Sequence, residues 1–232
     1  SVICAMQNDN PPFSLPDSQG VWRGMDVDSC RALAAAALGD ASKVTIRPVT
    51  GLTRFPSLQS GEVDVLFGST TWVTTRESAL GLSFAAPNYF SGQGFVVKTA
   101  LGVTKVAELD GATICVAQGT THEVTLGDHA RAHGLKFQPV VFERPDTMYQ
   151  AFFGGRCDAM TTDASQLAAL RVSALREPEA HIILPERISK EPLGPMVRHG
   201  DEEWRDIVAW TLAALIEAEE LGVTRAKIGR AS

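Results

Sequence analysis

The sequence lacks the features that mark nucleic-acid-binding proteins and membrane proteins. Its 232 residues carry a formal net charge of −6, and no run of Lys or Arg is longer than two. Because phosphate contacts need a basic face, this charge pattern argues against a nucleic-acid partner. The longest apolar stretches are Ala32–Leu38 and the region Ile207–Ile216. Both are shorter than the roughly 20 residues of a membrane-spanning helix.

Signatures of enzymes and metal sites are also missing. The sequence contains no G-x-S-x-G, H-E-x-x-H or G-x-G-x-x-G motif and no Walker loop. The five histidines are scattered, and His129 and His133, although four residues apart, have no third ligand nearby. We interpret these two as part of a solvated helix face. We therefore predict neither a metal nor a cofactor.

Two segments, 60–71 and 154–163, repeat one pattern. Each combines a glycine turn, an aspartate (Asp64 or Asp158), a short apolar strand and a polar tip five residues after the aspartate, at Ser69 or Asp163. Open α/β sheets bind small molecules at the carboxyl ends of their strands. The repeat therefore predicts two α/β lobes that face one cleft, with a chance similarity of two turns as the alternative.

The order of predicted elements also favours two lobes. A first β-α-β-α-β set comprises strands 2–6, 44–49 and 63–67 and helices 25–38 and 53–59, followed by a short helix from Arg76. A second set comprises strands 113–117, 138–142 and 157–161 and helices 120–133 and 147–153, followed by helix 165–174. An amphipathic helix spans 204–221. We place the crossings between lobes at about 92–95 and 185–188, so lobe 1 comprises 1–92 plus 188–232 and lobe 2 comprises 95–185.

The four cysteines, at positions 4, 30, 115 and 157, form no C-x-x-C pair. An even number at wide spacing fits two disulfides in an oxidising compartment, with four free thiols in a cytosolic protein as the alternative. Three connectivities are possible. We favour Cys4–Cys30 and Cys115–Cys157, because each bridge then stays inside one lobe and leaves an opening motion free.

The region 69–76 offers groups that bind a carboxylate. Ser69 and Thr71 follow a predicted strand, and Arg76 lies five residues further on. Arginine matches a carboxylate bidentately, although a surface arginine on a short helix is the plain alternative. Thr120 and Glu123 fit a capping box at the start of a helix. A helix N-terminus can also hold a carboxylate, beyond its role as a simple cap.

Asp163 could accept hydrogen bonds from an ammonium group together with Ser69, or it could cap the helix that follows. An arginine, a helix N-terminus and hydroxyls for a carboxylate, with an aspartate for an ammonium, match the α-carbon end of a free amino acid. Phe13, between prolines and Ser14, could form an apolar wall over the ligand or anchor its loop in the core.

The chain resembles the periplasmic amino-acid-binding proteins of ABC transporters, which form the polar amino-acid family of solute-binding proteins. The resemblance covers essentially the whole chain. It is carried by segments 12–14, 24–28, 58–64, 68–72 with Arg76, 118–121 and 162–163. The string Ser-Lys-Glu-Pro-Leu-Gly-Pro at 189–195 and the four cysteine positions resemble the general L-amino-acid branch.

The resemblance implies a two-lobed, type II periplasmic-binding-protein fold with two crossing strands as a hinge. It assigns the α-carboxylate to Arg76, Thr71 and Thr121, and the α-ammonium to Ser69 and Asp163. Arg54 matches an arginine that contacts the side-chain carboxylate in acidic-amino-acid binders, and a structural ion pair is the alternative. Gln7 stands where those binders have a second arginine, which favours amide ligands or a broad range.

The predicted function is capture of a free L-amino acid, with a leaning towards Glu, Gln, Asp or Asn or a broad range, and delivery to the membrane permease of an ABC transporter. We expect a periplasmic monomer without enzymatic activity, from which a leader has been removed. Members of this branch usually extend beyond residue 232. The alternatives are an amino-acid sensor domain and a cyclohexadienyl dehydratase-like enzyme, for which Glu123 and Asp146 are the candidate general acids.

Overall fold

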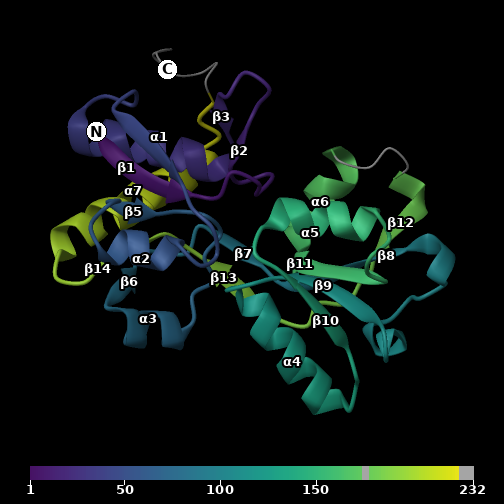
Figure 1. Cartoon of the computed structure of the whole chain (residues 1–232). Helices are drawn as coiled ribbons and strands as arrows, with labels where there is room; N and C mark the ends of the chain where they lie inside the picture. Colours follow the sequence, from purple (N-terminus) through teal and green to yellow (C-terminus); the bar gives the residue numbers. More distant parts are fainter. Residues whose placement is uncertain (174–177, 225–232) are drawn as a thin grey trace.

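The computed structural model describes residues 1–173 and 178–224, which form two five-stranded sheets in separate halves of the molecule (Figure 1). The first sheet has the order β4-β1-β5-β14-β6 and the second β10-β9-β11-β8-β12. Strand β1 pairs in parallel with β4 and β5, and β9 pairs in parallel with β10 and β11. An antiparallel strand then joins each set, β14 in the first sheet and β8 in the second.

The first sheet consists of β1 (Val2–Met6), β4 (Val44–Pro48), β5 (Val65–Leu66), β6 (Leu82–Phe84) and β14 (Met196–Arg198). The second consists of β8 (Gln93–Lys98), β9 (Thr113–Ala117), β10 (Gln138–Phe142), β11 (Ala159–Asp163) and β12 (His181–Ile183). The helices are α1 (Met25–Leu38), α2 (Arg54–Gln59), α3 (Thr74–Leu80), α4 (Thr121–His133), α5 (Pro145–Phe153), α6 (Ala164–Ser173) and α7 (Glu202–Glu220).

Most predicted elements are confirmed, with differences at their ends. The third strand of the first lobe pairs only over Val65–Leu66, and the loop predicted after β1 contains a small hairpin of β2 (Leu15–Pro16) and β3 (Trp22–Arg23). Strand β11 extends to Asp163, so this side chain stands on the strand end itself. Helix α5 begins at Pro145, whose fixed φ suits the first helical position. Ala174, the predicted end of α6, lies outside the described residues.

The repeated aspartates have one structural role in both halves. Asp64 Oδ2 accepts a hydrogen bond from Ile3 N at 2.8 Å, and Asp158 Oδ2 accepts one from Thr113 N at 2.8 Å. In return Asp64 N donates to Ile3 O, and Asp158 N donates to Thr113 O. Each aspartate thus ties the turn before the third strand to the start of the first strand. The repeated pattern therefore has a structural role. It sets the positions of Ser69 and Asp163, the polar residues five positions after each aspartate.

Each half has its own apolar core and its own disulfide. Clusters of buried Val, Leu, Met and Phe side chains pack between helices and sheet on either side. Cys4–Cys30 joins β1 to α1, and Cys115–Cys157 joins β9 to the turn before β11, with Cα–Cα distances of 6.4 and 5.7 Å. This is the pairing favoured from the sequence, and no cysteine is free.

Two short strands run between the halves. β7 (Tyr89–Ser91) and β13 (Glu191–Leu193) form an antiparallel pair that Figure 1 shows at the junction. The segments 92–95 and 185–188, where we predict the crossings, lie next to this pair, and Gln93 already belongs to β8. The lobe boundaries themselves stay a prediction.

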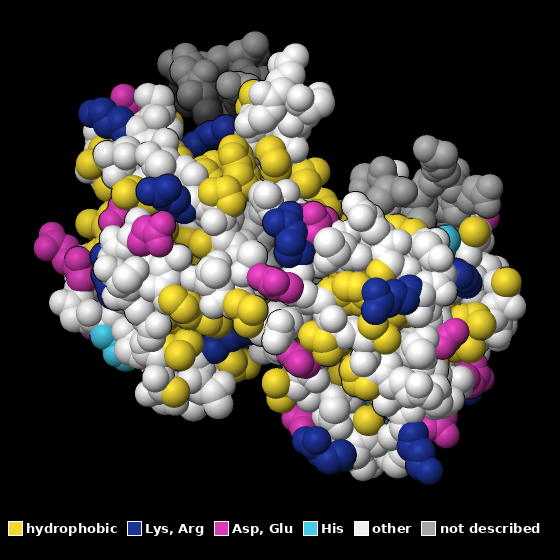
Figure 2. All heavy atoms as spheres, viewed as in Figure 1, with side chains coloured by type: hydrophobic (Ala, Val, Ile, Leu, Met, Phe, Trp, Pro, Cys, Tyr) yellow, Lys and Arg dark blue, Asp and Glu magenta, His cyan; other side chains and the backbone are white. Residues whose placement is uncertain are grey.

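The face shown in Figure 2 and the described helices have no feature typical of a nucleic-acid-binding or membrane-spanning protein. On the face shown in Figure 2, Lys and Arg are interspersed with Asp and Glu, and this face has no continuous basic patch. No helix among the described residues is long and apolar enough to cross a membrane.

Removing either disulfide should lower stability. The bridges close loops with sequence separations of 26 and 42 residues, and loop entropy gives roughly 3–4 kcal/mol for each. We expect Cys115→Ala/Cys157→Ala and Cys4→Ala/Cys30→Ala proteins to unfold at clearly lower urea concentrations than the oxidised wild type. Reducing the wild type should lower its midpoint further, and an unchanged midpoint after reduction would contradict the account.

Candidate functional site

The candidate site is a cleft between the two halves, at the carboxyl ends of β1, β5, β9 and β11. The first half contributes Gln7, Arg54, Gly68, Ser69, Thr71 and Arg76. The second half contributes Ala117, Thr120, Thr121, His122, Pro145, Met148, Thr162, Asp163 and Gln166. Seven of the eight predicted ligand-binding residues lie in this set. This is the cleft geometry that the repeated strand ends predict.

Two guanidinium groups face the cleft from α2 and α3. Arg76 Nη1 donates to Thr71 O at 2.9 Å, Arg54 Nη2 donates to Gly119 O at 3.1 Å, and both lie over the Phe55 ring. Burial lowers the pKa of Arg54 to about 9 and that of Arg76 to about 10, and nearby carboxylates oppose the shift. Both remain cationic at neutral pH. Arg54 Nε is buried without a hydrogen-bond partner in the described structure, so the cleft can receive an anion.

Ser69 is held in place by the start of α1. It adopts a left-handed backbone with φ of 51°, and its Oγ accepts a hydrogen bond from Asn10 Nδ2 at 3.0 Å. The preceding Gly68 N donates to Asp26 Oδ2 at 2.8 Å. Burial raises the pKa of Asp26 to about 6, while hydrogen bonds from Gly68, Ser69 and Asn88 oppose this shift. Sequence reasoning missed this positioning role of Asp26, because its partner Gly68 lies 42 residues away.

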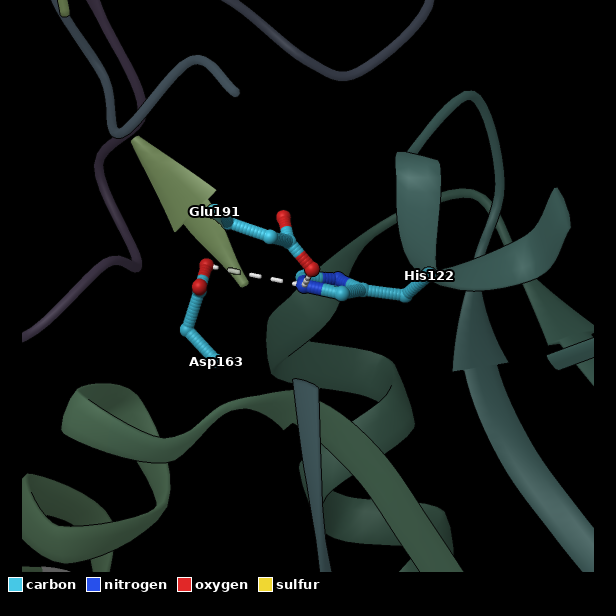
Figure 3. A group of neighbouring side chains, drawn as sticks. All are labelled: His122, Asp163 and Glu191. Atoms are coloured by element: carbon cyan, nitrogen blue, oxygen red, sulfur yellow. Dashed lines mark ion pairs between the residues drawn. The ribbon is translucent and has the colours of Figure 1, made fainter. Parts of the chain in front are cut away.

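Three buried side chains from different elements converge beside the cleft (Figure 3). His122 Nε2 lies 3.6 Å from Asp163 Oδ2 and 3.8 Å from Glu191 Oε1. Neither His122 Nε2 nor Asp163 Oδ1 has a hydrogen-bond partner among the described residues. Burial lowers the pKa of His122, but the carboxylates of Asp163 and Glu191 outweigh it, so this pKa lies above its ordinary value. Asp163 Oδ1 is a buried acceptor without a donor, and this marks a place for a cationic group.

Glu191 connects hydroxyls from both halves. Its Oε2 accepts hydrogen bonds from Thr71 Oγ1 at 2.6 Å and from Thr121 Oγ1 at 3.1 Å, and its Oε1 accepts one from Ser189 Oγ. Thr71 and Thr121 also contact each other at 3.1 Å. The two threonines therefore meet at the crossing strand β13. Sequence reasoning noted the string around Glu191 but gave the residue no role.

The charge of this group favours an ammonium over a metal ion. One atom each from His122, Asp163 and Glu191 lies within 4.8 Å of the others, a spacing that a divalent ion could use. However, Arg54 and Arg76 already face these carboxylates, and both oxygens of Glu191 accept hydrogen bonds. A singly charged donor of several hydrogen bonds satisfies the free acceptors with less added charge.

Two predictions about individual residues require correction or comment. The capping box is wrong, because Thr120 Oγ1 donates to Ala117 O at 2.7 Å and makes no cap bond, while Glu123 accepts from Gly119 N. The start of α4 therefore faces the cleft without a side-chain cap. Phe13 is fully buried, meets Tyr89 edge-on at 5.1 Å and is not among the residues that line the cleft, as its core alternative requires.

The cleft is closed by contacts between the halves. Asn10 Oδ1 accepts a hydrogen bond from Gln166 Nε2, and Asp9 Oδ2 accepts one from Asp146 N. The backbones at Gly51 and Gly119 approach so closely that a Cβ on Gly51 would lie 2.5 Å from Gln118 O. Closure therefore depends on a glycine at this contact.

Residues 2–229 match the bacterial extracellular solute-binding proteins, family 3. The chain belongs to this family. The predicted resemblance and the two-lobed type II fold are thereby confirmed.

Two curated relatives are similar to the chain over almost its whole length. The chain is 49% identical to the general L-amino acid-binding periplasmic protein AapJ of Rhizobium johnstonii, over 98% of this chain and 66% of that protein. It is also 49% identical to the glutamate/glutamine/aspartate/asparagine-binding protein BztA of Rhodobacter capsulatus, over 98% of this chain and 67% of that protein. The chain thus spans about two thirds of the length of these relatives.

A solved structure shares the fold closely. It is an ABC transporter/periplasmic binding protein from Brucella ovis with glutathione bound, at a TM-score of 0.93 and 47% identity. The match covers 97% of this chain and 71% of that chain.

Gly51→Ala should block closure and leave the two halves folded. The added Cβ would meet the Gln118 carbonyl oxygen only when the cleft is shut. We expect a larger radius of gyration by small-angle scattering at saturating amino acid, and weaker binding. The matched control is Gly127→Ala on α4, whose Cβ meets nothing closer than 3.8 Å and should behave as wild type. Equal scattering of the ligand-saturated Gly51→Ala and wild-type proteins would contradict the closure contact.

Proposed function

We propose that this chain captures a free L-amino acid in its cleft, as a periplasmic monomer, and delivers it to the permease of an ABC transporter. The observation that carries the proposal is the charge pattern of one closed cleft, in which two buried guanidinium groups face the buried carboxylate of Asp163, whose Oδ1 has no donor. A zwitterion has the complementary charges. The names of AapJ and BztA, both amino-acid-binding proteins, support the proposal.

The α-carbon end of the ligand would lie between Arg76 and Asp163. Arg76 would bind the carboxylate bidentately, with help from the uncapped start of α4. Thr71 and Thr121 would also help, by turning their hydroxyl protons from Glu191 to the ligand. Asp163 and Ser69 would accept hydrogen bonds from the ammonium group. Because Arg76 and Asp163 are buried, these charged contacts would form away from water.

Arg54 and Gln7 would face the side chain of the ligand. Both are buried and line the cleft, and Arg54 Nε lacks a partner. A cation and an amide favour side chains with oxygen atoms, namely Glu, Gln, Asp and Asn. The relative with glutathione bound supports a broader range of ligands.

We infer that the chain is a binding protein and not a dehydratase. Relatives with 46–49% sequence identity are named as binding proteins. The two candidate general acids, Glu123 and Asp146, do not line the cleft. A hydrogen bond from Arg144 lowers the pKa of Asp146, which keeps this carboxyl ionised.

Replacing either anchor should weaken binding strongly. Losing one partner of a buried charged contact costs about 2–5 kcal/mol, which is at least about tenfold in dissociation constant. We expect this loss for Arg76→Ala and for Asp163→Ala by titration calorimetry, with the best ligand from a thermal-shift screen of the twenty amino acids. Arg131→Ala, at an exposed ion pair on α4, is the matched control. Wild-type affinity in either anchor variant would remove that residue from the site.

Specificity should depend on Arg54. A lysine or arginine ligand would bring a second cation beside it, which is unfavourable in a closed cleft. We expect Glu, Gln, Asp and Asn to bind more tightly than Lys and Arg in competition assays, and Arg54→Ala to narrow the difference. If Lys or Arg displaced Glu and Gln from the wild type, Arg54 would not contact the ligand side chain.

A further inference from the structure

The proposed function gives no task to the imidazole of His122. This side chain is buried in the first turn of α4 and points between Asp163 and Glu191 (Figure 3). Its Nε2 and the neighbouring Asp163 Oδ1 both lack hydrogen-bond partners within the described chain. Gln93 Nε2 donates to the carbonyl oxygen of His122 at 3.0 Å and keeps this turn against the cleft.

We propose that His122 is a further ligand-binding residue. Its neutral imidazole accepts a hydrogen bond from the α-ammonium group beside Asp163. Binding of the amino acid therefore releases to the solvent the proton that His122 holds in the protein without ligand. The inference rests on the proposed function. It couples binding of an α-amino acid to the release of one proton.

In the empty cleft the surrounding charges favour a protonated His122. Asp163 on β11 and Glu191 on β13 lie 3.6 and 3.8 Å from its Nε2. Arg76 on α3 opposes the proton, and Arg54 on α2 also faces Asp163. The carboxylates outweigh both Arg76 and the effect of burial, which raises the pKa of His122 above its ordinary value. Below that pKa an imidazolium occupies the place beside Asp163 in the protein without ligand.

The ammonium group of the ligand cannot share that place with an imidazolium. Both groups are cations and both only donate hydrogen bonds. Once the proton leaves, Nε2 becomes an acceptor, and it joins Asp163 Oδ1 in receiving donors from the ammonium. Protonation of His122 therefore opposes ligand binding, and affinity falls as the pH is lowered. Below the pKa of His122 in the empty protein, affinity should rise about tenfold for each unit of pH, and above that pKa it should become constant.

The test is titration calorimetry of the chain with L-glutamine, which has no titratable side chain. Dissociation constants are measured between about pH 5.5 and 8. Buffers of different ionisation enthalpy report the protons released, and EDTA excludes metal ions. We compare the wild type with His122→Gln, which keeps an acceptor but cannot titrate, and with His129→Gln, which removes a half-buried imidazole from the same helix. Asp26, with a pKa of about 6, is present in all three, so differences isolate His122.

We expect the wild type and His129→Gln to release close to one proton below the pKa of His122 and to show the tenfold slope. His122→Gln should release none and lose that slope. Equal slopes and proton counts in the wild type and His122→Gln would overturn the inference while leaving the proposed function intact. If neither L-glutamine nor any other amino acid binds the wild type, both fail.

A second measurement covers the case that His122→Gln does not fold. Nuclear magnetic resonance of the wild-type imidazole can follow His122 with and without ligand. The inference requires its pKa to fall on binding. An unchanged or raised pKa would overturn it.

Discussion

Arg54 and Arg76 lie buried in the same cleft as Asp163 and Glu191, and burial makes each of these charges depend on partners of opposite sign. The protein supplies part of this compensation itself, through carbonyl oxygens for the guanidinium groups and hydroxyls for Glu191. Some hydrogen-bonding capacity remains free, at Arg54 Nε, His122 Nε2 and Asp163 Oδ1. In the proposed function a zwitterion would complete the set, so ligand binding and closure would stabilise the same buried charges.

The fold serves to hold these charges at one place. In each half an aspartate turn, Asp64 or Asp158, ties the third strand to the first and sets the position of the polar tip at its carboxyl end. The disulfides stay within one half each, so they stiffen the lobes without joining them. Backbone contact at Gly51 then limits how far the lobes can close. The aspartate turns and the disulfides act within each half, and the contacts between the halves hold the cleft closed.

Local patterns in the sequence predicted the elements, because strand ends, glycine turns and helix stops depend on neighbours in the chain. The division into two lobes favoured the disulfide pairing, and the family resemblance added Arg54, Gln7 and Thr121, so that seven of the fifteen cleft-lining residues were named. Local patterns did not predict contacts between residues that are distant in the chain. The proposed role of His122 on α4 depends on Asp163 on β11 and Glu191 on β13. Asp26 accepts a hydrogen bond from Gly68, which is also far away in the chain. The capping box failed for a local reason, since the Thr120 hydroxyl donates to Ala117 O instead of capping α4.

A crystal structure of the chain grown with L-glutamate would test the central claim most directly. The account predicts one ligand in the cleft, with its α-carboxylate on Arg76 and its α-ammonium on Asp163 and His122. It also predicts the side-chain carboxylate near Arg54. A ligand bound in the reverse direction, or one bound outside the cleft, would contradict the account.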